Sequence, residues 1–315
     1  MGIKNLNRFL LDNCSKKSIK KIHLKQLAKK TLTIDISIYL YKFVGENTLL
    51  ESMYLFISIL KKYEITPIFI FDGKPPPEKK ELLIQRRMEK LEAEQKYNEL
   101  QQKIDEISDE KMLEMENLKR QFIRITEGDI NNVKQLLDAY NVSYYDSKYE
   151  ADQLCAYLVK QRIASGCITD DMDMFLYGCS MVIRHISLLN HTAVVYDLEM
   201  ILKDLQMSEQ NFREIMVLSG TDYNIKMETS LYNTMKWYQE YNKYLFQNKG
   251  LSIDFYDWLS LNTEYIKDMK MLLKTYDMFL LENYDFSDLH IEKREKDIDR
   301  EKLKTIMEKE GFIFI

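Results

Sequence analysis

Two short stretches decide the fold, TLTID at residues 31–35 and TPIFIFDG at residues 66–73. Each is a run of β-branched and aromatic residues that stops at an acid, Asp35 or Asp72, and such runs are typical of buried strands. Between them, residues 49–63 carry apolar side chains at helical spacing. The order strand, helix, strand predicts a parallel sheet covered by helices.

A long charged segment follows the second strand. Residues 78–127 contain no Gly or Pro and are rich in Glu, Lys, Gln, Leu and Met, which favours helix. The segment is too long for one average helix, so we expect a hairpin of two helices that breaks near residues 105–109. The other expected elements are a helix at 129–140, a strand at 142–145, a helix at 150–162, a strand at 167–170, a hairpin at 181–186 and 193–196, and mostly helix from 197 onward.

Composition excludes several classes of protein. With 315 residues, 45% of them apolar and 30% charged, the chain is expected to be globular rather than disordered. No apolar run approaches the roughly 20 residues of a membrane span, and the N-terminus has no signal-peptide pattern. The four cysteines form no CxxC pair, which predicts reduced thiols in an intracellular protein that is not secreted.

Charge is distributed unevenly along the chain. The net charge is −5, which taken alone argues against a nucleic-acid binder. However, residues 16–30 hold seven lysines and no acid, and residues 74–90 hold six basic residues against three acidic ones. If metal ions neutralise seven carboxylates, the remaining charge is slightly positive, so the total does not exclude a polyanionic substrate.

Asp35, Asp72, Asp171 and Asp173 fall where predicted strands end, and ligands bind at that edge of open α/β sheets. Glu150 and Asp152 lie in the first turn of a predicted helix, and Asp222 lies just beyond another. The candidates are Asp35, Asp72, Glu150, Asp152, Asp171, Asp173 and Asp222. Taken singly, each has an ordinary explanation as a turn residue, a helix N-terminal charge or a solvated loop residue. Together they would repel one another unless cations neutralised them. A set of oxygen ligands without His or Cys suits Mg²⁺ or Mn²⁺, and a pair of such ions hydrolyses phosphodiesters in many enzymes.

One local expectation concerns the loop after residue 170. If this loop is extended, Asp171 and Asp173 point the same way, because alternate residues of an extended chain share a face.

Basic residues follow Asp72 closely. Lys79 and Arg86 are seven residues apart and would share one face of a helix, with Arg87 beside them. A solvated helix face is the ordinary explanation, but the nearby acids favour a cationic clamp on a scissile phosphate. Tyr41, taken by itself, is more typical of core or edge packing than of a platform for base stacking.

These motifs together resemble the flap endonuclease family, the XPG-type structure-specific 5′ nucleases. The resemblance holds in order from residue 1 to about residue 225. Its blocks are MGIKNL at 1–6, IDISIYLYKF at 34–43, FDGKPP at 71–76, YEADQLCA at 149–156, TDDMD at 169–173 and LSGTDY at 218–223. In the fourth block, Asp152 replaces the second Glu of the family's Glu-Ala-Glu.

The resemblance implies a fold and a division into domains. The fold is an α/β/α sandwich with a central, mostly parallel sheet (a PIN-like nuclease core), a helical arch insertion and a helical C-terminal region. Residues 1–225 would form the nuclease domain, made of an N-terminal segment (residues 1–77), the arch (residues 78–127) and an internal segment (residues 128–225). Residues 226–315 would form a divergent helical DNA-binding region packed on the core.

The resemblance also implies chemistry. The seven acids would hold two Mg²⁺ ions, replaceable by Mn²⁺, and the chain would hydrolyse DNA near single-strand/double-strand junctions in replication, repair or recombination. Asp171, Lys79 and Arg86 would be the catalytic residues. Gly2, Tyr41 and Arg87 would join Lys79 and Arg86 in binding the substrate.

The sequence departs from the family after Asp222. The family's Gly-rich helix–two-turn–helix, which binds duplex DNA and K⁺, is replaced by YNIKMETS at residues 223–230, without glycine. Duplex binding would then use other residues, for example Lys226, Lys236 and Lys243. No C-terminal sliding-clamp box is found.

The expected partner is therefore DNA, bound by a monomer with no role for a membrane. The chain would act in the nucleus or, for a viral member, at the host-cell replication site. Two alternatives stay open, a 5′–3′ exonuclease acting on nicked DNA or RNA and a catalytically inactive DNA-binding scaffold.

Overall fold

The computed structural model describes residues 3–102, 109–224, 229–248, 252–291 and 297–313. Within them the central sheet has seven strands in the order β1-β7-β6-β5-β2-β3-β4. The strands are β1 (Ile19–His23), β2 (Thr31–Asp35), β3 (Thr66–Phe71), β4 (Ser143–Asp146), β5 (Gly166–Ile168), β6 (Met181–Ser187) and β7 (Thr192–Asp197). Strands β2 to β6 are parallel, and β7 pairs antiparallel with both β6 and β1.

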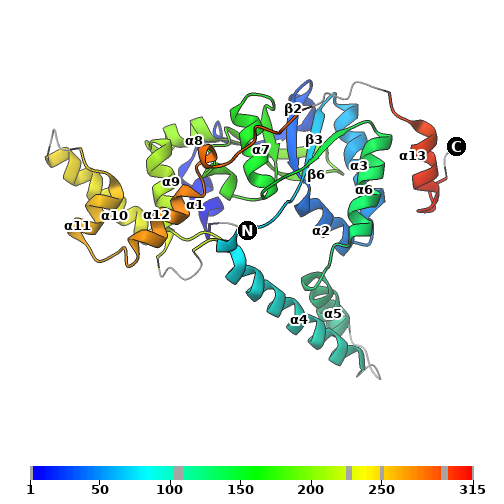
Figure 1. The fold of residues 1–315 in the computed structure, drawn as a ribbon, viewed down its shortest axis with the longest axis horizontal. Helices are drawn as coiled ribbons and strands as arrows, with labels where there is room; N and C mark the ends of the chain where they lie inside the picture. Colours follow the sequence, from blue (N-terminus) through cyan, green and yellow to red (C-terminus); the bar gives the residue numbers. More distant parts are fainter. Residues whose placement is uncertain (1–2, 103–108, 225–228, 249–251, 292–296, 314–315) are drawn as a thin grey trace.

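Helices flank the sheet (Figure 1). They are α1 (Leu6–Asn13), α2 (Ser37–Gly45), α3 (Leu49–Lys62), α4 (Lys80–Gln102), α5 (Asp109–Gln121), α6 (Glu127–Ala139), α7 (Ala151–Lys160), α8 (Leu198–Leu205), α9 (Glu209–Leu218), α10 (Leu231–Gln247), α11 (Phe255–Asn262), α12 (Met269–Asp277) and α13 (Arg300–Glu308). Short 3-10 turns are η1 (Leu24–Leu27), η2 (Pro77–Lys79), η3 (Asp173–Phe175) and η4 (Leu281–Asn283). Among the described residues, no helix is both long and apolar enough to cross a bilayer.

Two hydrophobic cores lie on opposite faces of the sheet. Alternate residues of β3 point to opposite faces, so Ile68 and Ile70 join one core while Phe69 and Phe71 join the other. The first core contains α1, α7 and α9, and the second contains α2, α3 and α6. The predicted α/β/α sandwich is confirmed.

The predicted hairpin of two helices is formed by α4 and α5, which project from the body of the protein (Figure 1). Ala93 and Leu118 are buried where the two helices meet, and the rings of Tyr97 and Phe122 pack 5.4 Å apart. The expected break near residues 105–109 falls largely on residues 103–108, which lie outside the described residues.

The C-terminal helices pack on both cores. Side chains of α10 and α12 enter the same core as α9, and α13 buries Leu303 and Met307 against the other core. The backbone N–H of Asp299 donates to the Ala139 carbonyl at the end of α6, 2.9 Å away. The proposed domain division at residue 225 stays a prediction.

Four features differ from the sequence-based expectations. Strand β1 lies within the lysine-rich stretch 16–30. Within the strand only Ile19 and Ile22 are buried, three residues apart and so without strand alternation. Helices α1 and α2 were not expected either. The loop after β5 is not extended, because Met172 has helical dihedral angles (φ −84°, ψ −15°) and Asp173 begins η3.

A close backbone contact joins the end of β3 to the start of α7. The Gly73 N–H donates to the Tyr149 carbonyl at 2.7 Å, and the Ser147 N–H donates to the Phe71 carbonyl at 2.9 Å. A Cβ atom at Gly73 would lie 2.0 Å from the Ser147 carbonyl oxygen, so only glycine fits. The contact holds Asp72 at the first turn of α7, where its Oδ1 accepts from the Ala151 N–H at 2.8 Å.

Gly73→Ala is expected to lower the free energy of unfolding by about 2 kcal/mol, since the two loops must separate to admit the methyl group. Urea denaturation measures the change. Gly128→Ala is the matched control, because a Cβ there meets only Thr126 Oγ1 at 3.5 Å in the first turn of α6. The control should be neutral or slightly stabilising, and equal losses in the two variants would contradict this account.

Candidate active site

Six of the seven candidate acids line one cavity of about 740 Å³. They are Asp35, Asp72, Glu150, Asp152, Asp171 and Asp222. Strands β2, β3 and β5 are neighbours in the sheet, and acids that follow these strands therefore meet at one edge. The seventh, Asp173, is 5% exposed; nearby Asp171 and Asp222 are among the charges acting on it.

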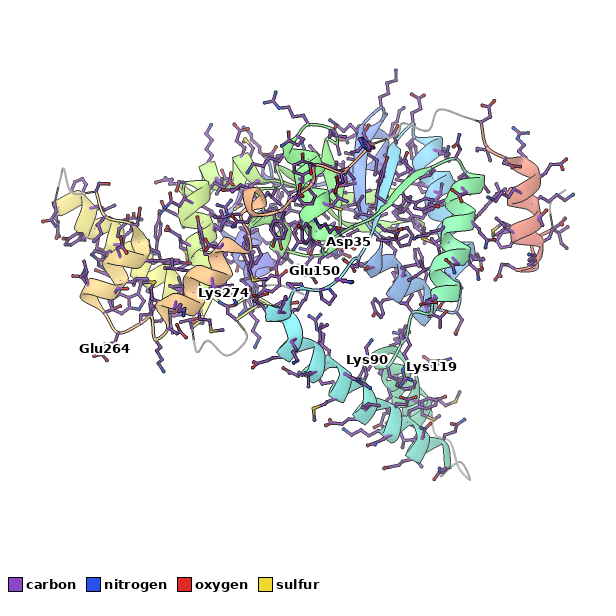
Figure 2. The ribbon with its side chains drawn as sticks, viewed as in Figure 1. Asp35, Lys90, Lys119, Glu150, Glu264 and Lys274 are labelled. Atoms are coloured by element: carbon purple, nitrogen blue, oxygen red, sulfur yellow. The ribbon has the colours of Figure 1, made fainter. Side chains whose placement is uncertain are left out.

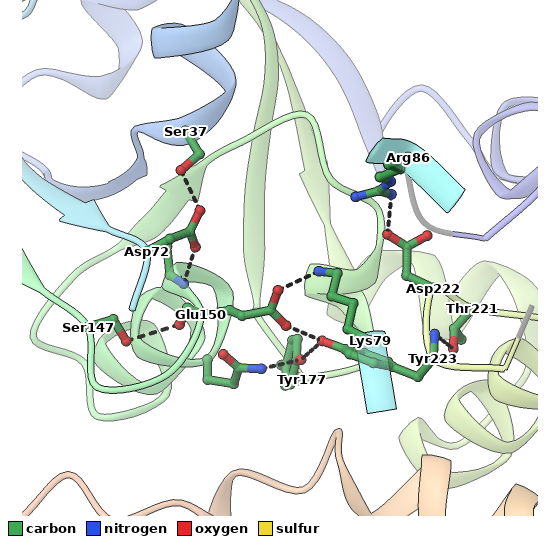
Figure 3. A network of polar contacts seen from close by, with 12 residues as sticks. Ser37, Asp72, Lys79, Arg86, Ser147, Glu150, Tyr177, Thr221, Asp222 and Tyr223 are labelled. Atoms are coloured by element: carbon green, nitrogen blue, oxygen red, sulfur yellow. Dashed lines mark hydrogen bonds and ion pairs between the residues drawn. The ribbon is translucent and has the colours of Figure 1, made fainter. Parts of the chain in front are cut away.

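The first turn of α2 connects Asp35 and Asp72. The backbone N–H of Ser37 donates to Asp35 Oδ1 at 3.1 Å, and its hydroxyl donates to Asp72 Oδ2 at 2.5 Å (Figure 3). The Thr169 hydroxyl, at the end of β5, donates to the second oxygen of Asp35 at 3.2 Å. Ser37 therefore holds the ends of β2 and β3 at a fixed separation.

Glu150 lies at the N-cap of α7 but makes no side-chain capping bond. Its Oε1 instead lies 2.5 Å from the ammonium of Lys79, and its Oε2 accepts from the Tyr223 hydroxyl at 2.8 Å (Figure 3). Lys79 and Glu150 are both largely buried. Asp152 follows in the first turn of α7, where the helix dipole favours negative charge.

The loop of residues 169–173 is folded tightly on itself. The Asp171 N–H donates to the Thr169 hydroxyl at 3.1 Å, and the Asp173 N–H donates to Asp171 Oδ1 at 3.0 Å. The buried guanidinium of Arg184 donates to the Asp170 carbonyl at 3.0 Å. This loop keeps Asp171 and Asp173 in one region although it is not the extended segment we expected.

Asp222 sits in a turn that is fixed from within. Gly220 has a φ of +101°, which favours glycine. The buried side chain of Asn224 accepts from the Thr221 N–H at 2.5 Å and donates to the Val217 carbonyl at 2.8 Å. The carboxylate of Asp222 then accepts from Arg86 of α4 at 2.7 Å (Figure 3).

Crowding of the acids raises their pKa values. Burial, followed by the charges of Asp72 and Asp171, raises the pKa of Asp35 to about 7. Burial and neighbouring carboxylates also raise the pKa of Asp152 and of Asp173 well above the ordinary value. These carboxylates therefore need a cation to stay ionised at neutral pH.

The pKa of Lys79 is raised although its side chain is largely buried. Burial lowers the pKa of Lys79, but the charges of Glu150, Asp152 and Asp222 outweigh burial and raise it. Lys79 is therefore a fixed cation among the acids.

The donor set fits a hard divalent cation. All seven candidate ligands are carboxylates, and Asp152 Oδ1 and Asp173 Oδ1 are buried without a hydrogen-bond partner in the described structure. Within the same described residues, no three acidic, His or Cys side chains already stand close enough to hold a metal ion. Four of the acids are instead in contact with Lys79, Arg86 or Ser37.

Basic residues line the same cavity as the acids. We call the basic residues the wall and the six acids the floor. Lys79 and Arg86 reach the cavity as predicted by their spacing, although Lys79 ends η2 and only Arg86 lies within α4. Arg87 also lines the cavity. The sequence analysis missed Lys90 of α4 and Arg120 of α5, which line it as well. Lys90 lies one turn beyond Arg86, and this spacing could have identified it.

The arch and the sheet edge face each other across this cavity (Figure 2). In that view Asp35 and Glu150 lie at the body of the protein and Lys90 on the arch. Tyr41 of α2 is 45% exposed on the cavity wall, with the ammonium of Lys90 4.8 Å from its ring centre, so it does not pack in the core.

Other predicted binding residues are less informative. Gly2 and Lys226 lie outside the described residues. On α10, the ammonium of Lys236 lies 4.3 Å from the ring centre of Tyr232, and Lys243 pairs with Glu240 at 2.6 Å.

Two polar residues of the site were not foreseen. Ser37 lies two positions after Asp35, and Tyr223 directly follows Asp222. Their side chains contact acids that are 35 and 73 residues away in the sequence, so local patterns could not assign these contacts.

Comparisons with known proteins show which family this sequence is similar to. The sequence matches the XPG N-terminal domain over residues 1–93 and the XPG I-region over residues 141–222. Flap endonuclease 1 of Cryptosporidium muris is 31% identical over 71% of this chain and 52% of its own length. A probable RAD2-like endonuclease of Invertebrate iridescent virus 6 is 26% identical over 71% of this chain and 67% of its own length.

The fold is similar to solved structures of such proteins. The catalytic core of Rad2 in complex with DNA substrate superposes with a TM-score of 0.70 at 22% identity, covering 99% of this chain and 96% of that one. Flap endonuclease-1 from Methanococcus jannaschii gives 0.60 at 20% identity, covering 93% and 90%. The chain spans between about half and two thirds of the length of the curated relatives named above. With XPG matches covering both its N-terminal and internal regions, the chain belongs to the flap endonuclease family of XPG-type nucleases.

Proposed function

We propose that this chain is a structure-specific 5′ nuclease that hydrolyses DNA phosphodiester bonds near junctions of single and double strands, using two divalent metal ions. The observation that carries the proposal is the cavity in which six carboxylates face the cations of Lys79, Arg86, Arg87, Lys90 and Arg120. A phosphodiester bridged to the acids by metal ions would meet the cations on its other side. Rad2, with which the fold is shared, was solved with a DNA substrate, and this supports DNA as the substrate class.

The seven acids would hold the two ions, Mg²⁺ or Mn²⁺. The ions would supply Lewis-acid stabilisation of the charge that develops on the phosphodiester. Asp35, Asp152 and Asp173 would contribute most of the free energy gained when the metal ions bind, since their carboxylates are buried among other negative charges. Arrival of divalent cations would remove that repulsion.

Lys79 and Arg86 would exchange partners when the substrate binds. Each pairs with an acid of the floor, Glu150 or Asp222. Two oxygens of a phosphate can accept hydrogen bonds from the planar guanidinium of Arg86. The ammonium of Lys79 can pair with the phosphate as a point charge. Once metal ions neutralise the acids, both cations would be released to stabilise the phosphate in the transition state.

The direct test is cleavage. In Mg²⁺, a labelled 5′-flap DNA should be cut near its junction, and Asp171→Asn should lower the single-turnover rate by at least about 100-fold with DNA still bound. Nicked duplex and RNA substrates of matched length, run in parallel, measure the exonuclease alternative. Binding without any cleavage by the unaltered protein would establish the scaffold alternative instead.

Lys79→Ala is expected to slow cleavage by about 100-fold while changing the dissociation constant for DNA only a few-fold. Single-turnover kinetics and a binding titration in Ca²⁺ measure the two effects. Lys80→Ala, at the exposed neighbouring residue, is the matched control and should change neither. Equal losses in rate and affinity for Lys79→Ala would mean that Lys79 only holds the substrate.

Stability should depend on pH in a defined direction. A carboxyl whose folded pKa is raised, as for Asp35 to about 7, stabilises the fold at low pH and loses that contribution as pH rises from about 4 through 7. Without divalent ions, the melting temperature should therefore be lower at pH 8 than at pH 5.5, and Mg²⁺ should restore it at pH 8.

Two variants complete this measurement. Asp152→Asn should raise the melting temperature at pH 8 and reduce the effect of Mg²⁺, because it removes one buried charge. Asp12→Asn, at an exposed residue of α1, should leave both unchanged. A fall in stability on going from pH 8 to pH 5.5 in the unaltered protein would contradict the role assigned to the crowded acids.

A further inference from the structure

The side chain of Tyr223 lies between two residues of the candidate site. Its hydroxyl donates to Glu150 Oε2 at 2.8 Å, and Lys79 Nζ lies 5.5 Å from its ring centre (Figure 3). Lys79 also contacts the other oxygen of Glu150 at 2.5 Å. The three side chains therefore form a closed set in which Tyr223 touches both members of the ion pair.

A chain of buried hydrogen bonds sets the direction of the Tyr223 hydroxyl. The Gln153 amide donates to the Tyr177 hydroxyl at 2.9 Å, which lies 3.3 Å from the Tyr223 hydroxyl. Because the Tyr223 proton is directed to Glu150, Tyr177 donates to the Tyr223 oxygen. All these groups are at most 9% exposed, so water does not compete for the carboxylate of Glu150 on this side.

The ring of Tyr223 is held as firmly as its hydroxyl. The Tyr223 N–H donates to the Thr221 hydroxyl at 3.2 Å within the turn that carries Asp222. On its buried side, the ring packs against Phe279 with centres 5.5 Å apart. The ring is thus a fixed surface beneath the ammonium of Lys79, and a cation over an aromatic face is attracted to it.

We propose that Tyr223 is a positioning residue with two separable roles: its hydroxyl orients Glu150 for a divalent metal ion, and its ring places the Lys79 ammonium for the phosphate. This inference rests on the proposed function. A group that donates to a metal-binding carboxylate fixes the carboxylate's orientation, and its loss commonly weakens metal binding by 10- to 100-fold. The ring would act on the rate at saturating metal, because Lys79 is a ligand of the substrate and not of the metal.

Two substitutions separate the roles. Tyr223→Phe removes the hydroxyl and keeps the ring, so Mn²⁺ affinity measured by calorimetry without DNA should fall about 10-fold. Its single-turnover cleavage rate at saturating Mn²⁺ should stay within about twofold of the unaltered protein. Tyr223→Leu removes the ring as well, and its rate at saturating Mn²⁺ should fall a further 10-fold or more.

Tyr256→Phe is the matched control. Tyr256 is also a buried tyrosine, and its hydroxyl donates to the Glu214 carbonyl at 2.7 Å, outside the cavity of the site. It should lose stability to a similar extent as Tyr223→Phe while keeping Mn²⁺ affinity and cleavage rate. The control shows what a purely structural hydroxyl contributes.

Each outcome decides one claim. Unchanged Mn²⁺ affinity in Tyr223→Phe overturns the role of the hydroxyl, and equal saturated rates for Tyr223→Phe and Tyr223→Leu overturn the role of the ring. If Tyr223→Leu fails to fold, the Phe variant still tests the hydroxyl. If the unaltered protein does not bind Mn²⁺, the proposed function itself is overturned. That result differs from equal Mn²⁺ affinity in the unaltered protein and Tyr223→Phe, which overturns only the role of the hydroxyl.

Discussion

Repulsion between carboxylates is the constraint on which the rest of this structure depends. Parallel strands β2, β3 and β5 lie side by side and bring Asp35, Asp72 and Asp171 to one edge of the sheet. Ions of like charge in a partly buried cavity raise one another's pKa and oppose folding. The surrounding contacts oppose that repulsion: Ser37 donates to two acids, the N-terminus of α7 faces Asp72, and Lys79 and Arg86 supply positive charge. If the site binds cations as proposed, the repulsion lowers the stability of the metal-free protein and favours cation binding.

The same constraint ties the arch to the sheet. Only six residues lie between Asp72, which follows β3, and Lys79, at the end of η2, and α4 begins directly afterwards. The first two turns of the arch are therefore held to the floor by the Lys79–Glu150 and Arg86–Asp222 pairs. Both pairs are partly or largely shielded from water, so losing one partner would leave the other charge buried without compensation. Any ligand that competes for either partner changes how the arch meets the core.

The sequence was informative wherever local pattern and chain order decide the structure. The strands that stop at Asp35 and Asp72, the parallel sheet and the helical hairpin follow from periodicity and from the order of the elements, whereas the α/β/α sandwich was implied by the family resemblance. The sequence did not predict contacts between segments that lie far apart along the chain. Arg120 reaches the cavity because α5 folds back on α4, and Tyr223 finds Glu150 across the core. The loop at 169–173 turns into η3, because Thr169 and Asp171 satisfy its N–H groups from within.

The chemistry of this cavity limits what it can recognise. If the acids hold metal ions and the basic residues contact phosphates, as proposed, both groups respond to backbone charge, which is the same for every base sequence. Under that proposal, selection of one substrate over another must come from shape, through elements that line the cavity such as the arch of α4 and α5. Helices α10 to α12 contribute no described residue to that lining. Those C-terminal helices share a continuous core with α9, which leads directly to Asp222. Those helices and the turn that carries Asp222 and Tyr223 therefore belong to one packed unit.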